Sequence, residues 1–190
     1  MAIIHRTTLT PTKLELLTAW LPGTPWYDAA GEPELAKAGG FRLDDPAGEV
    51  GIEFMVVTDT AGAGTVSLLV PMTYRGAPAD GLEHALIGTT EHGVLGTRWV
   101  YDGVHDPVLL AQLGALLEGR AQPQAQSVSD AVDQEVTWSR DPAAAEGTTP
   151  RPLRVLRPGS EVPEGAAGHV EGAWQLPDGS RVRGVFAVLG

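Results

Sequence analysis

The sequence predicts an α+β fold: a mainly antiparallel β-sheet flanked by two principal helices, with an additional β-rich C-terminal segment. Two stretches, near residues 11–21 and 106–119, carry leucines at helical spacing. Between them, residues 50–56 and 66–74 alternate apolar and other side chains with the period of a strand. Short connections separate the predicted strands, and the regular strand–helix alternation of a parallel sheet is absent from the sequence.

Both predicted helices begin with a polar capping residue followed by proline. Thr10 precedes Pro11, and Asp106 precedes Pro107, so each proline stands where a helix does not need its N–H group. Gly119 is a natural end for the second helix. The apolar stripes are Leu14, Leu17 and Leu21 in the first helix, and Leu109, Leu110, Leu113, Leu116 and Leu117 in the second. A weaker third helix is predicted over residues 32–38.

We expect residues 50–56 and 66–74 to form a hairpin with one buried face, joined by the flexible segment 59–64. Further strands are predicted over residues 3–4, 85–90, 98–101, 135–139, 153–156, 169–176 and 180–189. Pro177-Asp178-Gly179 is turn chemistry between the last two of these strands. Trp174 shares strand parity with Val170, so we expect its ring in the core.

The length of 190 residues favours one domain or one domain with a small appendage. The composition changes after the second helix, where residues 122–126 are polar and contain a proline. We therefore expect one domain over residues 1–122 and a β-rich extension over residues 123–190, packed on the same sheet or extending it.

Charge and composition exclude several classes of function. The formal net charge is −11, and a nucleic-acid backbone needs a positive face, so nucleic acid is not an expected partner. The apolar runs are too short for a transmembrane helix, the N-terminus does not resemble a signal peptide, and we expect a cytoplasmic protein without a membrane partner. The sequence has no cysteine, so thiolate metal sites and cysteine nucleophiles are excluded.

Catalytic and cofactor motifs are missing from the sequence. It contains no phosphate-binding loop, no dinucleotide fingerprint, no G-x-S-x-G and no H-E-x-x-H, so no catalytic residue, cofactor or metal site is predicted. Ionisable residues gather instead between positions 84 and 106. The candidate ligand-binding residues are His84, Glu91, His92, Tyr101, Asp102 and His105. An ordinary surface role for the histidines competes with this interpretation, because strand ends commonly carry such residues.

Several ordered segments carry a family resemblance. They are Gly48 to Phe54, Val70 to Pro78, Ala85 to Gly93 and Arg98 to Gly103, together with His5 and the Thr10-Pro11-Thr12-Lys13 helix start. Over about residues 1–122 they resemble the N-terminal cap domain of actinobacterial maltokinases and its stand-alone relatives. The abundance of Gly, Pro and Arg and the near absence of Lys indicate a GC-rich genome, which agrees with that source.

The resemblance implies an α+β module with a curved antiparallel sheet, and a place in actinobacterial trehalose and glycogen metabolism. It does not imply kinase activity. The residues after 122 are too few for kinase lobes, and no histidine is followed by aspartate at the second position, as an H-x-D catalytic loop requires.

Two functions therefore remain open. The first is a non-catalytic binding or protein-interaction module, acting as a partner or sensor in carbohydrate metabolism, with a small-molecule ligand as one option. The alternative is a small-molecule enzyme with an acid–base site around Glu91, His92, Asp102 and His105. A homodimer is also expected, because a cap that normally lies against a kinase lobe should expose an apolar face. Closure of that face by the C-terminal strands is the competing outcome.

Overall fold

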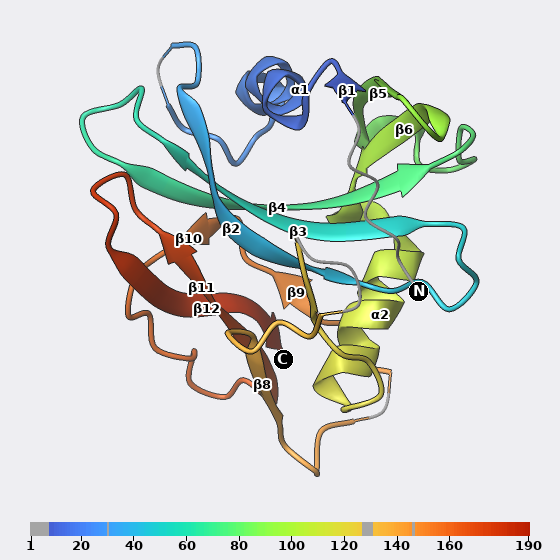
Figure 1. Cartoon of the computed structure of the whole chain (residues 1–190). Helices are drawn as coiled ribbons and strands as arrows, with labels where there is room; N and C mark the ends of the chain where they lie inside the picture. Colours follow the sequence, from blue (N-terminus) through green and yellow to red (C-terminus); the bar gives the residue numbers. More distant parts are fainter. Residues whose placement is uncertain (1–7, 30, 127–130, 146) are drawn as a thin grey trace.

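The computed structural model describes residues 8–29, 31–126, 131–145 and 147–190 (Figure 1). The expected strand over residues 3–4, and His5, lie outside the described residues. The helices are α1 (Lys13–Trp20) and α2 (Pro107–Leu117), with short 3-10 turns at Leu21–Gly23, Glu83–Ala85 and Gly103–His105. No helix of this described part is both long enough and apolar enough to cross a membrane.

The described strands form one antiparallel sheet of twelve strands. They are β1 (Leu9–Thr10), β2 (Leu35–Leu43), β3 (Gly51–Asp59), β4 (Val66–Arg75), β5 (Leu86–His92), β6 (Gly96–Asp102), β7 (Gln124–Ala125), β8 (Thr137–Arg140), β9 (Arg151–Pro152), β10 (Val155–Leu156), β11 (Gly168–Gln175) and β12 (Arg181–Leu189). Their order is β1-β5-β6-β4-β3-β2-β11-β12-β9, while β7 pairs with β2, β8 with β11 and β10 with β4. The antiparallel α+β prediction is confirmed, although the sheet dominates and the two helices are short.

The β3–β4 hairpin is the centre of the molecule, and its register pairs Gly51 with Tyr74 and Asp59 with Val66. The predicted hairpin is confirmed. The prediction of one buried face is wrong, because β3 is buried from Ile52 to Asp59 without interruption. Both faces are covered because α1 lies on one side, and α2 with β11 and β12 lies on the other (Figure 1).

The two faces hold separate apolar cores. On the α1 side, Leu17 and Leu21 pack against alternate residues of the hairpin, namely Met55, Val57, Leu68, Val70 and Met72. On the opposite side, Ile52, Phe54 and Val56 pack against the leucines of α2 and against Trp174 and Phe186 of the C-terminal strands. The period-two pattern holds within each strand, but the two predicted apolar sets lie on opposite faces of the hairpin. The C-terminal extension supplies part of the cover for the second face.

Two contacts fix the extension to the hairpin. The indole N–H of Trp174, whose side chain is fully buried as expected, donates to Ser67 Oγ at 2.9 Å. Strand β10 pairs with the first part of β4, and the Leu69 N–H donates to the Arg154 carbonyl at 2.9 Å. The extension thus extends the sheet and covers one of its faces.

The helix boundaries correct two expectations. The first helix begins after Thr12, not Thr10, because Thr12 and Glu15 form a reciprocal capping box. Strand β2 replaces the helix predicted over residues 32–38, since Leu35 and Lys37 pair with β3 instead. The second helix begins as predicted, with the Asp106 carboxylate accepting from the Val108 N–H, and Gly119 follows its end at a φ of 71°.

The C-terminal strands also follow the prediction closely. Strands β11 and β12 pair from Gly168 opposite Leu189 to Gln175 opposite Arg181, and the expected turn joins them. Of the strand predicted over residues 153–156, only Val155–Leu156 forms, and it pairs with β4. A separate short strand, Arg151–Pro152, precedes it and pairs with β12.

Candidate functional site

The six predicted ligand residues lie at two ends of the β5–β6 hairpin. Leu86 lies opposite Tyr101 at the base, and His92 lies opposite Gly96 at the tip. Six residues of extended strand separate these ends by roughly 20 Å. The base therefore brings together His84, Tyr101, Asp102 and His105, and the tip holds Glu91 and His92.

At the base of the hairpin, Asp102 connects the cap-like segment to the C-terminal extension. Its buried carboxylate accepts a hydrogen bond from Arg154 Nη2 at 2.5 Å, and the same oxygen lies 3.8 Å from His105 Nε2. The His105 ring meets the His84 ring edge-on, with centroids 4.9 Å apart. The Arg154 guanidinium also lies over the Trp26 ring at 4.6 Å, so one cation contacts an acid and an aromatic face.

Two polar atoms of this ion pair lack partners. Among the described residues, Asp102 Oδ1 and Arg154 Nη1 are buried and have no hydrogen-bond partner. A buried unpaired acceptor beside a buried unpaired donor carries a free-energy cost. Tyr101 differs, because its hydroxyl accepts from the Ala79 N–H at 2.8 Å.

At the tip, the predicted residues organise the turn. Glu91 accepts from the Thr97 hydroxyl at 2.7 Å across the two strands. The Nδ1 atom of His92 accepts from the N–H groups of Val94 and Leu95, at 3.2 and 3.0 Å. These contacts hold the β5–β6 turn, and they leave Val94 and Leu95 exposed at its end.

The sequence did not single out the most enclosed glutamate of the hairpin. Glu53 of β3 is 3% exposed and accepts from Lys13 Nζ at 2.6 Å, from the Tyr74 hydroxyl at 2.6 Å and from Gln126 Nε2 at 2.9 Å. Burial raises its pKa, but Lys13 and the two hydrogen bonds from Lys13 and Tyr74 outweigh that effect and hold the pKa below its ordinary value. Burial, and then the Glu53 charge, raise the pKa of Tyr74 well above its ordinary value.

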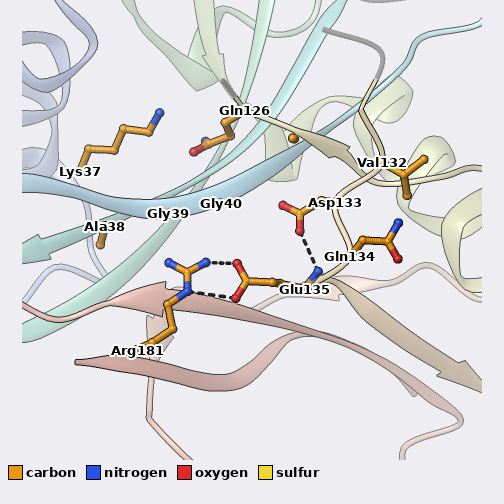
Figure 2. Close-up of a pocket in the computed structure, with 11 residues that line it drawn as sticks. Lys37, Ala38, Gly39, Gly40, Gln126, Val132, Asp133, Gln134, Glu135 and Arg181 are labelled. Atoms are coloured by element: carbon orange, nitrogen blue, oxygen red, sulfur yellow. Dashed lines mark hydrogen bonds and ion pairs between the residues drawn. The ribbon is translucent and has the colours of Figure 1, made fainter. Parts of the chain in front are cut away.

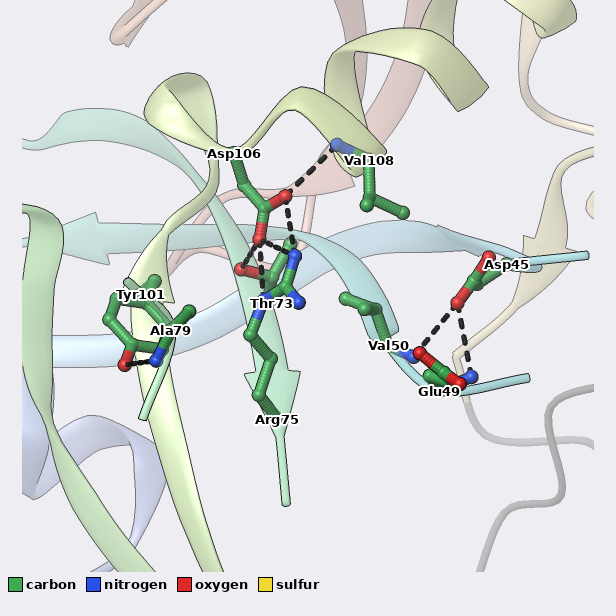
Figure 3. A network of polar contacts seen from close by, with 9 residues as sticks. All are labelled: Asp45, Glu49, Val50, Thr73, Arg75, Ala79, Tyr101, Asp106 and Val108. Atoms are coloured by element: carbon green, nitrogen blue, oxygen red, sulfur yellow. Dashed lines mark hydrogen bonds and ion pairs between the residues drawn. The ribbon is translucent and has the colours of Figure 1, made fainter. Parts of the chain in front are cut away.

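Asp106 is the second buried acid with a complete set of partners (Figure 3). It accepts from the Thr73 hydroxyl at 2.8 Å, from Arg75 Nε at 3.0 Å and Nη2 at 2.9 Å, and from the Val108 N–H at 2.9 Å. The capping role was predicted, whereas the ion pair with Arg75 was not. The network joins the start of α2 to the end of β4.

Asp59 is the third buried acid with a complete set of partners, and it fixes the chain that follows α1. It accepts from the Tyr27 hydroxyl at 2.6 Å and from the N–H groups of Glu34 and Ala61, at 2.9 and 3.0 Å. Burial, together with the hydrogen bond to Asp59, raises the pKa of Tyr27 to about 12. Trp26, next to it, meets Trp20 edge-on at 5.8 Å and so covers the end of α1.

No three histidine, aspartate or glutamate side chains of the described ranges are placed to hold one metal ion. The described acids mainly connect elements. Glu53 links α1 to β3, Asp106 links α2 to β4, and Asp102 links β6 to the extension. The arrangement is a sheet stabilised by polar contacts between its elements, with further polar groups at the two ends of the β5–β6 hairpin.

The structure thus defines an antiparallel α+β module whose hairpin is enclosed by its own helices and C-terminal strands. Residues 20–106 match the family model of the maltokinase N-terminal cap domain, which confirms the resemblance for this part of the chain. The match runs from the end of α1 to the cap of α2, so α2 and strands β7–β12 lie outside it. A search of the curated proteins found no match.

The lowered pKa of Glu53 predicts a contribution to acid sensitivity. Because the folded-state pKa lies below the ordinary 4.5, the stabilisation is present above that value and is lost as pH falls through the folded pKa. At neutral pH we expect Glu53→Gln to lower the free energy of unfolding by about 3 kcal/mol, because a buried ion pair is broken. Urea denaturation at neutral and acid pH should show that acidification lowers the free energy of unfolding less in the variant than in the natural chain.

The matched control is Glu49→Gln, an exposed glutamate just before β3, which should change neither the stability nor its pH dependence. If acidification lowers the free energy of unfolding of Glu53→Gln as much as that of the natural chain, Glu53 does not supply the stabilisation.

Proposed function

We propose that the chain is a non-catalytic binding or protein-interaction module, a partner or sensor in actinobacterial trehalose or glycogen metabolism. The observation that carries the proposal is the match of residues 20–106 to a domain that accompanies a maltose-phosphorylating kinase. In this proposal residues 1–122 are the cap-like part, and residues 123–190 complete the same folding unit in the cytoplasm.

The use of the buried acids supports a non-catalytic role. A general acid or base must reach a substrate. Glu53, Asp59 and Asp106 are nearly inaccessible, and each has three or more hydrogen bonds that join separate elements. The alternative enzyme site gains no support, because Glu91 and His92 lie at the opposite end of the hairpin from Asp102 and His105.

The first test is enzymatic. The purified protein should neither hydrolyse ATP nor phosphorylate maltose, because phosphoryl transfer needs carboxylates that hold magnesium and a residue that orients the nucleophile. A coupled assay for ADP release measures this. Sugar-dependent ADP release that disappears on substitution of one acidic residue, for example Asp102→Asn, would refute the proposal.

The predicted ligand residues stay a proposal, and the hairpin base has the better support. There His84 and His105 are exposed side by side, next to the incompletely paired Asp102 and Arg154. In an NMR titration with maltose or trehalose, we expect the imidazole signals of His84 and His105 to shift first. Shifts confined to residues 141–190 would contradict this placement.

The homodimer also stays a prediction. Its premise was an uncovered apolar face, and β11 and β12 of the same chain cover one apolar face of the hairpin. Arg181 of β12 pairs with Glu135 of its own chain. The apolar surface left for a dimer includes Val94 and Leu95, which are 62% and 45% exposed.

Light scattering at micromolar protein in physiological salt measures the assembly. A dimer has twice the chain mass of 19.9 kDa, and replacing both Val94 and Leu95 with serine should then reduce the mass to that of one chain. A mass near 19.9 kDa that is unchanged on concentration would show that the C-terminal strands have closed the monomer.

A further inference from the structure

An open hollow of about 520 Å³ lies beside β2, away from both ends of the β5–β6 hairpin (Figure 2). It lies where the segments around β7 and before β8 approach β2 and the start of β12. Its lining carries two cations, Lys37 and Arg181, and two acids, Asp133 and Glu135, together with Gly39, Gly40 and Gln126. None of the sequence motifs pointed to this place.

Glycine stands in β2 at the edge of the hollow because the neighbouring strands leave no room for a side chain. The pairing of β2 with β3 shifts between Lys37 and Gly39, as in a β-bulge. Gly40 follows with a φ of 121°, and a Cβ atom there would lie 1.9 Å from the Phe54 carbonyl oxygen and 2.8 Å from Gln126 Nε2. A side chain at this position would therefore collide with β3 and with the side of the hollow.

The two lysines of the chain are both near this part of β2, in a protein of net charge −11. Lys13 is paired with the buried Glu53, and Arg181 is paired with Glu135 on the other side of β2. Lys37 is exposed and has no carboxylate within ion-pairing distance among the described residues. Figure 2 shows its amine end on the side of β2 where Gln126 lies, away from the Arg181–Glu135 pair.

The surroundings compensate the Lys37 charge only in part. Partial desolvation lowers its pKa, the Glu53 charge opposes this, and the Lys13 charge lowers the pKa further. Glu53 forms its close contacts with Lys13 and two neutral donors, and none of these contacts involves Lys37. An anion next to the amine would favour its protonated form.

We propose that this hollow binds a small anionic ligand of the phosphate or carboxylate class, whose charge pairs with Lys37. Gln126 uses one amide N–H for Glu53, and its amide group retains a second N–H and a carbonyl oxygen for the ligand. The site is separate from the hairpin base and is not required by the proposed function.

The lysine content makes a direct test possible. Protein labelled with ¹³C at lysine Cε gives two signals, and Lys37→Gln assigns them. We titrate with inorganic phosphate and, separately, with citrate, each against sodium chloride at the same ionic strength. The expected result is a saturable shift of the Lys37 signal and a raised Lys37 pKa, with little change at Lys13. The anion that binds more tightly identifies the ligand class.

Substitutions of Lys37 distinguish a specific binding site from general charge attraction. We expect Lys37→Gln to weaken binding at least about tenfold and Lys37→Arg to retain most of it. The control is Arg151→Gln, an exposed cation on β9, which should bind like the natural chain. The proposal is overturned if both lysine signals shift equally, if sodium chloride reproduces the shifts, or if Lys37→Gln binds as well as the natural chain.

Discussion

The β3–β4 hairpin is buried on both faces, and the rest of the structure depends on this. Each face presents alternate residues of the same two strands, so the hairpin needs two independent covers. The short helix α1 supplies the first, with Leu17 and Leu21. The second cover needs a larger area, and α2, β11 and β12 form it together. A chain ending at α2 would leave part of the core around Phe54 facing water, a free-energy cost on the order of 2 kcal/mol for each large side chain exposed.

Polar contacts fix each cover at one place. Apolar packing is not directional, so hydrogen bonds and ion pairs select the position of each element. Glu53 holds α1 through Lys13, and Asp106 holds α2 through Arg75 and its own capping contact. The extension is held by Trp174 on Ser67 and by Arg154 on Asp102. Removing one partner would leave a buried polar group unpaired, which is why these contacts determine position as well as stability.

Local signals in the sequence were sufficient for the elements whose own residues decide their conformation. The Asp106-Pro107 cap and the alternation from Val66 to Tyr74 predicted α2 and β4 correctly. Local signals failed where a distant partner decides, as in β2, whose first residues have a helical composition but pair with β3. For the same reason the sequence grouped six ligand residues that the hairpin separates, and it passed over Glu53, whose partners Lys13 and Gln126 are 40 and 73 positions away.

The distribution of cations explains which groups remain available for a ligand. Arginine has a planar fork that fits a carboxylate. Arg75 and Arg181 each bind an acid of their own chain through two nitrogens, and Arg154 binds Asp102 through one. Lysine is a point charge on a flexible stem, which lets Lys13 reach from α1 to an acid in the sheet. With these pairs formed, the central acids are already neutralised by internal partners. An incoming anion at Lys37 therefore competes chiefly with Glu53, whose charge acts on this lysine but is already paired with Lys13.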